Sequence, residues 1–220
     1  MLVRTPKSGC LAGGGPYTVR TMPAPPESLA NIPNVLSFAR IPLAVLIFIC
    51  IGHGWWLAAL AVFSVAAFTD WLDGWWARKY GPLTLVGRNL DTVTDKILVC
   101  GTFVYLAPVE SAGIPTWAAV LVLSRELLVT AVRGVIEATG QKFGADQFGK
   151  LKMGLQCAVL IGVFLLQWWR AEGFSSEVLA VLEPVQVALF WAMVAATVGS
   201  AAQYLVKAQR MLKAQGTRPA

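Results

Sequence analysis

Four aspartates stand at two regular spacings in the middle of the sequence. Asp70 and Asp73 directly follow one apolar run, and Asp91 and Asp95 begin the next. On helices, spacings of three and four residues place each pair on one face. Two neighbouring helices joined by the short segment 79–86 would then bring four carboxylates together. Carboxylates crowded into a small site repel one another, whereas hard divalent cations prefer oxygen ligands and substrate phosphates. The spacing therefore predicts a metal site, with two ions, that orients a diphosphate.

The composition of the chain lies outside the range of soluble domains. Of its 220 residues, 56% are hydrophobic and 14% are charged, whereas a typical soluble domain is about 45–50% apolar and 25% charged. Disordered chains are poor in apolar residues, so disorder of the chain as a whole is excluded. Four scattered cysteines without a CxxC pair exclude a disulfide scaffold and zinc-ligand spacing. We therefore expect an integral membrane protein.

Apolar runs of the length needed to span a bilayer, about 20 residues, recur six times along the chain. They predict an all-α integral membrane protein with six transmembrane helices, at 33–51, 55–75, 90–106, 115–136, 151–168 and 178–206. These runs form one membrane domain over 31–208. The segment 1–30 is rich in glycine and proline and lacks the apolar core of a signal peptide. We expect it to be a disordered cytoplasmic tail, and 209–220 to be a basic C-terminal tail.

The lysines and arginines are distributed unequally between the predicted loops. With the N-terminus inside, 17 of the 18 fall in cytoplasmic regions and only Arg170 lies outside. The positive-inside rule therefore places both termini in the cytoplasm. A cytoplasmic face of this charge suits anionic lipid headgroups and phosphorylated substrates. We expect membrane lipids, and no nucleic acid, as its partners.

This membrane context decides between two explanations of the four aspartates. They could be solvated groups at helix ends, with Asp91 as the partner of an N-terminal helix dipole. Charges at membrane depth are costly, however, and usually face a partner or a polar cavity. Four acids at two helical spacings beside small residues therefore favour a functional site.

The stretch 70–95 resembles the signature of the CDP-alcohol phosphotransferase family, D-x2-D-G-x2-A-R-x8-G-x3-D-x3-D. The match covers all eight fixed positions, at Asp70, Asp73, Gly74, Ala77, Arg78, Gly87, Asp91 and Asp95. The resemblance implies a six-helix membrane fold, in agreement with the count of apolar runs. It also implies transfer of a phosphoalcohol from a CDP-linked donor to an acceptor hydroxyl, with release of CMP.

The resemblance also implies a role for each matching residue. The metal ligands, for Mg²⁺ or Mn²⁺, would be Asp70, Asp73, Asp91 and Asp95. In addition, Asp95 would be the general base on the acceptor hydroxyl. Gly74 and Ala77 would leave space for the cytidine nucleotide, Arg78 would pair with the donor diphosphate, and Gly87 would permit close approach to the third helix. Members of the family often form homodimers, which small residues four apart in the last span allow without requiring.

Two further segments resemble the phosphatidylglycerophosphate synthase branch of this family. The segment 31–40 has Asn34 and Ser37 at positions implied to lie near the nucleotide, and Arg40 at the level of the headgroups. An interfacial anchor is the alternative role for Arg40. The segments 124–127 and 149–152 resemble the same branch, whereas Thr92 stands where that branch often has proline. A basic group near these segments suits the phosphate of the acceptor, and its members are Arg125, Arg133, Lys150 and Lys152.

These observations predict transfer of a phosphatidyl group from CDP-diacylglycerol to glycerol 3-phosphate, in the inner (cytoplasmic) membrane with the site facing the cytoplasm. Inositol phosphate, serine or another alcohol are alternative acceptors. The basic group would serve no purpose for serine, which lacks a phosphate. An ion-coupled transporter is an alternative of a different class, but no internal repeat of the kind common in transporters is evident. A catalytically silent scaffold is the third alternative, although no position of the signature is degraded.

Overall fold

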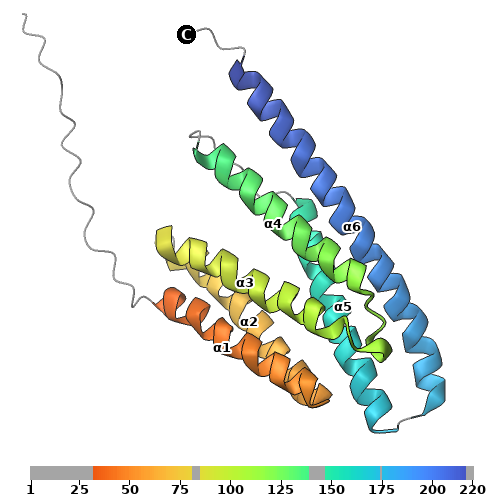
Figure 1. Cartoon of the computed structure of the whole chain (residues 1–220). Coiled ribbons are helices and arrows are strands. Elements are labelled where there is room, and N and C mark those ends of the chain that lie inside the picture. Colours follow the sequence, from red (N-terminus) through yellow and green to blue (C-terminus); the bar gives the residue numbers. More distant parts are fainter. Residues whose placement is uncertain (1–31, 81–84, 139–146, 174, 217–220) are drawn as a thin grey trace, which may run out of the picture.

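The computed structural model describes residues 32–80, 85–138, 147–173 and 175–216. Within these ranges the chain is helical and contains no β-strand (Figure 1). The elements are α1 (Ile32–Gly52), α2 (Trp56–Tyr80), α3 (Leu85–Leu106), the 3-10 helix η1 (Glu110–Ala112), α4 (Thr116–Ala138), α5 (Gln147–Ala171) and α6 (Ser176–Gly216). Each of the six apolar runs thus lies in its own helix, and the all-α prediction is confirmed. The predicted tail at 1–30 lies outside the described residues.

The helices pack in two groups that meet through α5 and through the contact of α4 with α3. α1 lies against both α2 and α3, while α4 packs on α6 and on α3 (Figure 1). α5 contacts α2 on one side and α6 on the other. Among the described residues, α2 and α3 make few direct contacts, although the sequence suggested that they pair with each other. α1 packs against both of these helices and so links them.

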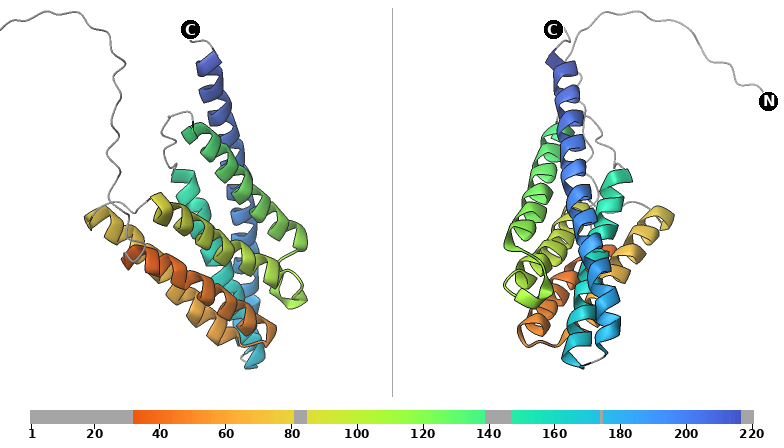
Figure 2. Two further views of the ribbon diagram at one scale, coloured as in Figure 1. Left: turned by 60° about the vertical axis from the view of Figure 1, so that its left-hand side comes forward. Right: turned by 90° about the vertical axis from the view of Figure 1, so that its right-hand side faces the viewer.

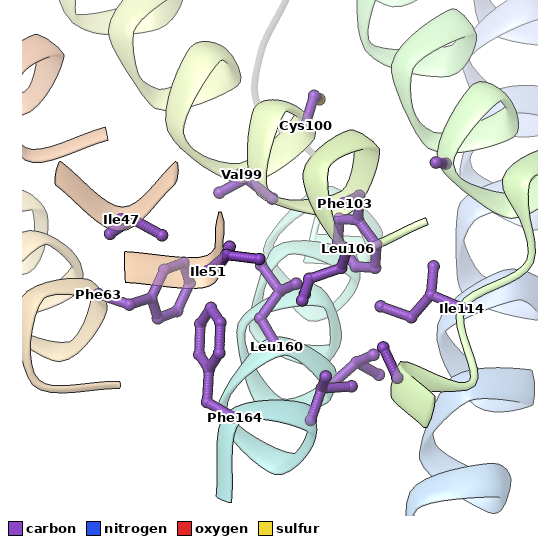
Figure 3. Close-up of a cluster of buried hydrophobic side chains, with 14 of the residues drawn as sticks. Ile47, Ile51, Phe63, Val99, Cys100, Phe103, Leu106, Ile114, Leu160 and Phe164 are labelled. Atoms are coloured by element: carbon purple, nitrogen blue, oxygen red, sulfur yellow. The ribbon is translucent and has the colours of Figure 1, made fainter. Parts of the chain in front are cut away.

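Aromatic and aliphatic side chains from all six α-helices form the main core. Ile47 of α1, Phe63 of α2, Phe103 of α3 and Phe164 of α5 are all fully buried. The rings of Phe63 and Phe164 lie with their centroids 5.8 Å apart, and Leu160 fills the space beside them (Figure 3). Close packing of this kind limits how far one helix can shift relative to another. The core therefore holds α1, α2 and α3 in a fixed relation.

The turn between α1 and α2 is set by a single glycine. Gly54 adopts a left-handed conformation with φ of 71°, which costs glycine little because it has no Cβ. The amide of Trp55 donates to the carbonyl of Cys50, and the amide of Gly54 donates to that of Ile51. This pair of hydrogen bonds is a Schellman motif, which ends α1 and redirects the chain into α2.

A second, smaller core joins α4 to α6. It contains Val129, Ile136, Tyr204 and Ala208. Beyond this contact, the C-terminal end of α6 projects past the other helices (Figure 2). α6 continues to Gly216 and so enters the segment that the sequence suggested as a tail.

Among the described residues, two helices are long and apolar enough to cross a membrane, by length and composition. They are the segments Leu151–Ala171 of α5 and Ser176–Met211 of α6. Large hydrophobic side chains also stay exposed on the outer faces of the bundle; Phe68 is 60% exposed and Val181 is 66% exposed. Exposed apolar surface on this scale marks a membrane or protein contact in a folded chain. Both observations suggest that the bundle associates with a membrane.

Candidate active site

Two of the four signature aspartates meet at one buried arginine. Arg40 of α1 donates from Nη1 to Oδ1 of Asp95 on α3, at 2.6 Å. Its Nη2 lies 3.2 Å from Oδ1 of Asp70 on α2. A planar guanidinium can hold two carboxylates in a fixed geometry because its N–H groups form a rigid fork. Arg40 therefore joins the two acid-bearing helices, which contact each other little.

Arg40 is more deeply buried than the two aspartates that it contacts. The side chain of Arg40 is only 1% exposed, whereas those of Asp70 and Asp95 are 30% and 24% exposed. A buried charge is costly unless it is paired. Arg40 is thus a fixed internal cation, while the two carboxylates remain reachable from outside. The sequence suggested that Arg40 lies at headgroup level or acts as an interfacial anchor, and its burial excludes exposure to a lipid surface.

The backbone confirms the helical spacing of the remaining signature positions. α2 carries Asp73 one turn after Asp70, and α3 carries Asp91 one turn before Asp95. Residues three or four apart on a helix share a face. Several of the predicted site residues have side chains outside the described part of the chain: Asn34, Ser37, Asp73, Gly74, Ala77, Arg78, Gly87, Asp91 and Lys150.

A second charged cluster lies on α4 and α5. Arg125 donates from Nη1 to Oε1 of Glu126 at 2.8 Å, and Nζ of Lys152 donates to the same oxygen. The side chains of Arg125 and Lys152 are 7% and 5% exposed, and that of Glu126 is 14% exposed. The structure thus brings together two of the residues predicted to hold an acceptor phosphate. Arg133 is half-buried two turns further along α4.

α6 completes the surroundings of Arg125, which the sequence did not predict. The Nε group of Arg125 donates to the Ser200 hydroxyl at 3.2 Å, and its guanidinium carbon lies 5.4 Å from the centre of the Tyr204 ring. Both partners are buried. A Cβ placed on Gly149 of α5 would lie 3.4 Å from the Tyr204 hydroxyl, which is ordinary van der Waals contact, so α5 also packs against this ring. Ser200 and Tyr204 are four residues apart, a spacing that places them on one helix face.

The helix that carries Asp95 also carries a lysine directed towards the second cluster. Lys96 is half-buried, and its Nζ donates to the hydroxyl of Thr130 on α4. That hydroxyl donates in turn to the backbone carbonyl of Glu126, at 2.7 Å. α3 therefore has the signature acid on one side and a cation near the charged cluster on the other.

Comparison with known proteins places this arrangement in a family. The sequence matches the profile of CDP-alcohol phosphatidyltransferases over residues 30–206. The chain belongs to the CDP-alcohol phosphatidyltransferase family. Its matched segment begins just before α1 and ends inside α6, so it includes Arg40, both described aspartates and the charged cluster.

Members of this family with curated names resemble the chain over most of its length. A CDP-diacylglycerol–glycerol-3-phosphate 3-phosphatidyltransferase of Bacillus subtilis is 32% identical over 150 residues, which are 61% of this chain and 77% of the relative. The protein of that name from Shigella flexneri serotype 5b is 33% identical over 184 residues, 81% of this chain and 95% of the relative. A probable phosphatidylglycerophosphate synthase of Mycobacterium tuberculosis is 34% identical over 144 residues, which are 63% of this chain and 67% of the relative.

CDP-alcohol phosphatidyltransferases generally depend on divalent metal ions, and the donor set of this chain fits such an ion. Asp70 and Asp95 contribute hard carboxylate oxygens from two helices that one guanidinium brings close together. Oxygen donors of this type suit Mg²⁺ and Mn²⁺. Within the part of the chain whose side chains the structure describes, no group of three or more His, Cys, Asp and Glu residues lies together. The two further predicted ligands, Asp73 and Asp91, fall outside that part.

A cavity of about 170 Å³ lies elsewhere, between η1, α5 and α6. Gln167 and Arg170 line it, and both already bond within the protein, to the Ser111 side chain and carbonyl respectively. Arg170 follows Lys152 by 18 positions on α5, roughly 27 Å along a helix. The cavity therefore lies at the opposite end of α5 from the charged cluster and is not part of the candidate active site.

Proposed function

We propose that this family member transfers the phosphatidyl group of CDP-diacylglycerol to glycerol 3-phosphate, giving phosphatidylglycerophosphate and CMP. The observation that carries the proposal is the buried cluster of Arg125, Glu126 and Lys152 beside the helix of Asp95. Such a cluster suits an acceptor that brings its own phosphate, because buried cations require anionic partners. The curated names of the relatives, which include glycerol 3-phosphate, support the same acceptor.

In the proposed reaction, the acceptor hydroxyl oxygen attacks the phosphorus of the phosphatidyl group. A new P–O bond forms, the bond from that phosphorus to the CMP oxygen breaks, and CMP leaves with the electron pair. Asp95 takes the proton of the attacking hydroxyl. One or two divalent ions held by Asp70, Asp73, Asp91 and Asp95 would neutralise the charge on the diphosphate and orient it.

Arg40 gives this site its geometry in the proposal. By holding Oδ1 of Asp95 at 2.6 Å, it fixes the orientation of the carboxylate before substrate binds. Transfer of this kind depends mainly on positioning and on fixed charges aimed at the reacting groups. The same guanidinium keeps Asp70 at a set separation from Asp95. α1 therefore supports the chemistry although it carries none of the signature residues.

The donor would lie along the signature helices. We place the cytidine nucleotide against Gly74 and Ala77 of α2, with Arg78 on the diphosphate and Gly87 permitting close approach of α3. Asn34 and Ser37, at the start of α1, would lie near the nucleotide. Arg133 and Lys150 would add to the acceptor site formed by Arg125 and Lys152. The exposed apolar faces of the bundle suit lateral entry of the acyl chains from lipid.

We further propose a topology in which all six helices cross the inner membrane and both termini are cytoplasmic, with a homodimer as the assembly. The distribution of lysine and arginine supports the orientation. Single cysteines introduced at His53 and at Gln209, in a chain without its native cysteines, would test it in intact cells. We expect an impermeant maleimide to label position 53 only. Labelling of position 209 alone would contradict the proposed topology and indicate the opposite orientation.

An acceptor panel tests the proposed reaction. The purified protein is given CDP-diacylglycerol, Mg²⁺ or Mn²⁺, and one of glycerol 3-phosphate, inositol phosphate or serine, and CMP release is measured. We expect CMP only with glycerol 3-phosphate. Release of CMP with inositol phosphate alone would support the proposed reaction type but contradict glycerol 3-phosphate as the acceptor. No release of CMP with any alcohol would contradict the enzymatic proposal.

A further inference from the structure

Two consecutive residues of α3 face different parts of the site. Asp95 accepts a hydrogen bond from Arg40 of α1, whereas Lys96 donates one to Thr130 of α4. Successive side chains on a helix point about 100° apart, so α3 separates the signature acids from the charged cluster on α4 and α5. Lys96 lies next in sequence to the signature residue Asp95 and is linked through Thr130 to Glu126 of that cluster.

Among the side chains that the structure describes, cations outnumber carboxylates around Lys96. The negative charge of Glu126 attracts its ammonium, whereas the positive charges of Arg125 and Arg133 repel it. Arg125 and Lys152 pair with the carboxylate of Glu126, and Lys96 is linked through the Thr130 hydroxyl to the backbone carbonyl of the same residue, so three described cations share one described carboxylate. Burial of like charges is unfavourable unless an anion offsets them. A phosphate monoester, which carries close to two negative charges, would neutralise this group.

The ammonium of Lys96 has the capacity to bind such an anion. An ammonium group has three N–H donors, and Thr130 accepts one of them. Lys96 is half-buried rather than enclosed, unlike Lys152, whose side chain is 5% exposed. A ligand can therefore reach Lys96, whereas the more deeply buried Arg125 and Lys152 contribute fixed positive charge.

We propose that Lys96 binds the phosphate of the acceptor and so determines where the acceptor hydroxyl lies relative to Asp95. This inference rests on the proposed function, because it concerns the same reaction and the same acceptor. The phosphate lies on the α4 side of α3, and the reacting hydroxyl lies at Asp95. Because the two contacts come from adjacent residues, the site favours a short polyol phosphate over an acceptor whose phosphate is remote from its hydroxyl.

Two variants of Lys96 test the proposal through separate kinetic constants. Lys96→Met removes the charge and keeps the length, and we expect the KM for glycerol 3-phosphate to rise about 10- to 100-fold, as for loss of a hydrogen bond to a charged group. The KM for CDP-diacylglycerol should change less than about twofold, since uniform loss of acceptor binding leaves donor binding intact. Lys96→Arg should restore most of the acceptor affinity. Arg210→Met, which removes an exposed cation of α6, is the matched control.

A binding measurement separates substrate contact from a structural role. Glycerol 3-phosphate should raise the melting temperature of the wild-type protein in detergent, and this shift should be lost in Lys96→Met. Thr130→Val removes the described partner of Lys96 but leaves its charge, so the shift should persist. A shift retained in Lys96→Met, or lost equally in both variants, would overturn the proposal. If Lys96→Met does not fold, Lys96→Gln replaces it under the same criteria.

The controls also separate the two proposals from each other. Wild-type protein that releases no CMP with glycerol 3-phosphate contradicts the proposed function, and the role of Lys96 fails with it. Wild-type protein that uses glycerol 3-phosphate, combined with an unchanged acceptor KM in Lys96→Met, contradicts only the role of Lys96.

Discussion

Arg40 and Asp95, 55 residues apart in the sequence, are joined by a hydrogen bond of 2.6 Å between Nη1 and Oδ1. The arginine is almost completely buried and comes from a helix without signature residues. Its second amino group lies 3.2 Å from Asp70. The distance between the two acid-bearing helices is thus set through a third helix, and a change at Arg40 should act on the metal ligands as a pair.

The first prediction concerns the fork of Arg40. Arg40→Lys keeps the charge but lacks the rigid planar fork that fixes both carboxylates, so we expect kcat to fall about 10-fold, whereas Arg40→Met should lower it about 100-fold or more through misplacement of the acids. CMP release at saturating substrates measures both. The Mg²⁺ concentration for half-maximal activity should rise in both variants, because the ligands are no longer held in place.

A matched substitution at the other end of the bundle provides the control. Arg170 forms an exposed ion pair with Glu183 at 2.7 Å, and exposed pairs contribute little to stability. Arg170→Met should therefore keep the activity and the metal requirement of the wild type. Wild-type kinetics in Arg40→Met would show that the buried guanidinium has no part in positioning the acids.

The second prediction concerns Asp95 as the general base. Asp95→Asn keeps the size of the side chain and an oxygen acceptor for Arg40, but the amide cannot take a proton. We expect turnover to fall at least about 1,000-fold, since general-base catalysis contributes roughly 10²–10⁴-fold and a metal ligand is lost as well. Stabilisation of the protein by CDP-diacylglycerol should remain largely intact. Activity near that of the wild type would remove Asp95 from the base role.

The spacing of the signature acids could be predicted because helical periodicity is local in sequence. Asp70 and Asp95 lie on the expected helices, as do the apolar runs around them. Arg40 could not be placed in the same way, since its contacts depend on how α1 packs between two other helices. A basic residue near a predicted membrane boundary has the same sequence pattern whether it faces lipid or a buried carboxylate.

The third prediction concerns the cluster on α4 and α5. Arg125→Ala removes a buried cation, and we expect the KM for the acceptor to rise about 10- to 100-fold with little change for the donor. Glu126→Gln should give a smaller rise in the same constant, because Arg125 and Lys152 lose the carboxylate that holds them. Steady-state kinetics with each substrate varied in turn measure these effects. Equal changes in both KM values would place the acceptor elsewhere.

The fourth prediction concerns the contribution of α6 to acceptor binding. Ser200→Ala removes the hydroxyl that accepts from Arg125 Nε at 3.2 Å. A hydrogen bond to a charged group contributes about 1.5–3 kcal/mol at most. Because the guanidinium still donates to Glu126 in this variant, we expect the acceptor KM to rise only about three- to tenfold. Ser200→Thr, which retains a hydroxyl, is the matched variant. An unchanged KM in Ser200→Ala would confine the acceptor site to the other helices.

The role of α6 illustrates a second limit of sequence reasoning. Arg125 and Ser200 are 75 residues apart, and serine among small residues in an apolar helix is equally typical of close helix packing. The basic residues themselves were apparent because charge is rare in this chain. Their partners were not, since neutral hydroxyl and aromatic groups give no comparable contrast in composition.

The last prediction concerns the packing that keeps α1 and α3 together. A Cβ on Gly101 of α3 would lie 2.5 Å from Cζ of Phe48 on α1. A shift of the Phe48 ring would disturb its stacking on Tyr105, where the centroids are 4.9 Å apart and the planes 10° apart. Gly101→Ala gains about 1 kcal/mol of helix propensity but incurs an overpacking cost of about 1–3 kcal/mol. Overpacking should therefore outweigh propensity and lower the melting temperature.

Gly134→Ala of α4 is the matched control, because no atom lies within 4 Å of its added Cβ. It should be as stable as the wild type or more stable by up to about 1 kcal/mol, from propensity alone. Phe48→Leu should reduce the penalty of Gly101→Ala, which gives a coupling free energy in a double-mutant cycle. Because Gly101 shares α3 with Asp95 and Phe48 shares α1 with Arg40, a separation of these helices should also lower kcat severalfold in Gly101→Ala. A lower melting temperature with unchanged kcat would mean that α1 and α3 can separate near Phe48 without disturbing Arg40 and Asp95.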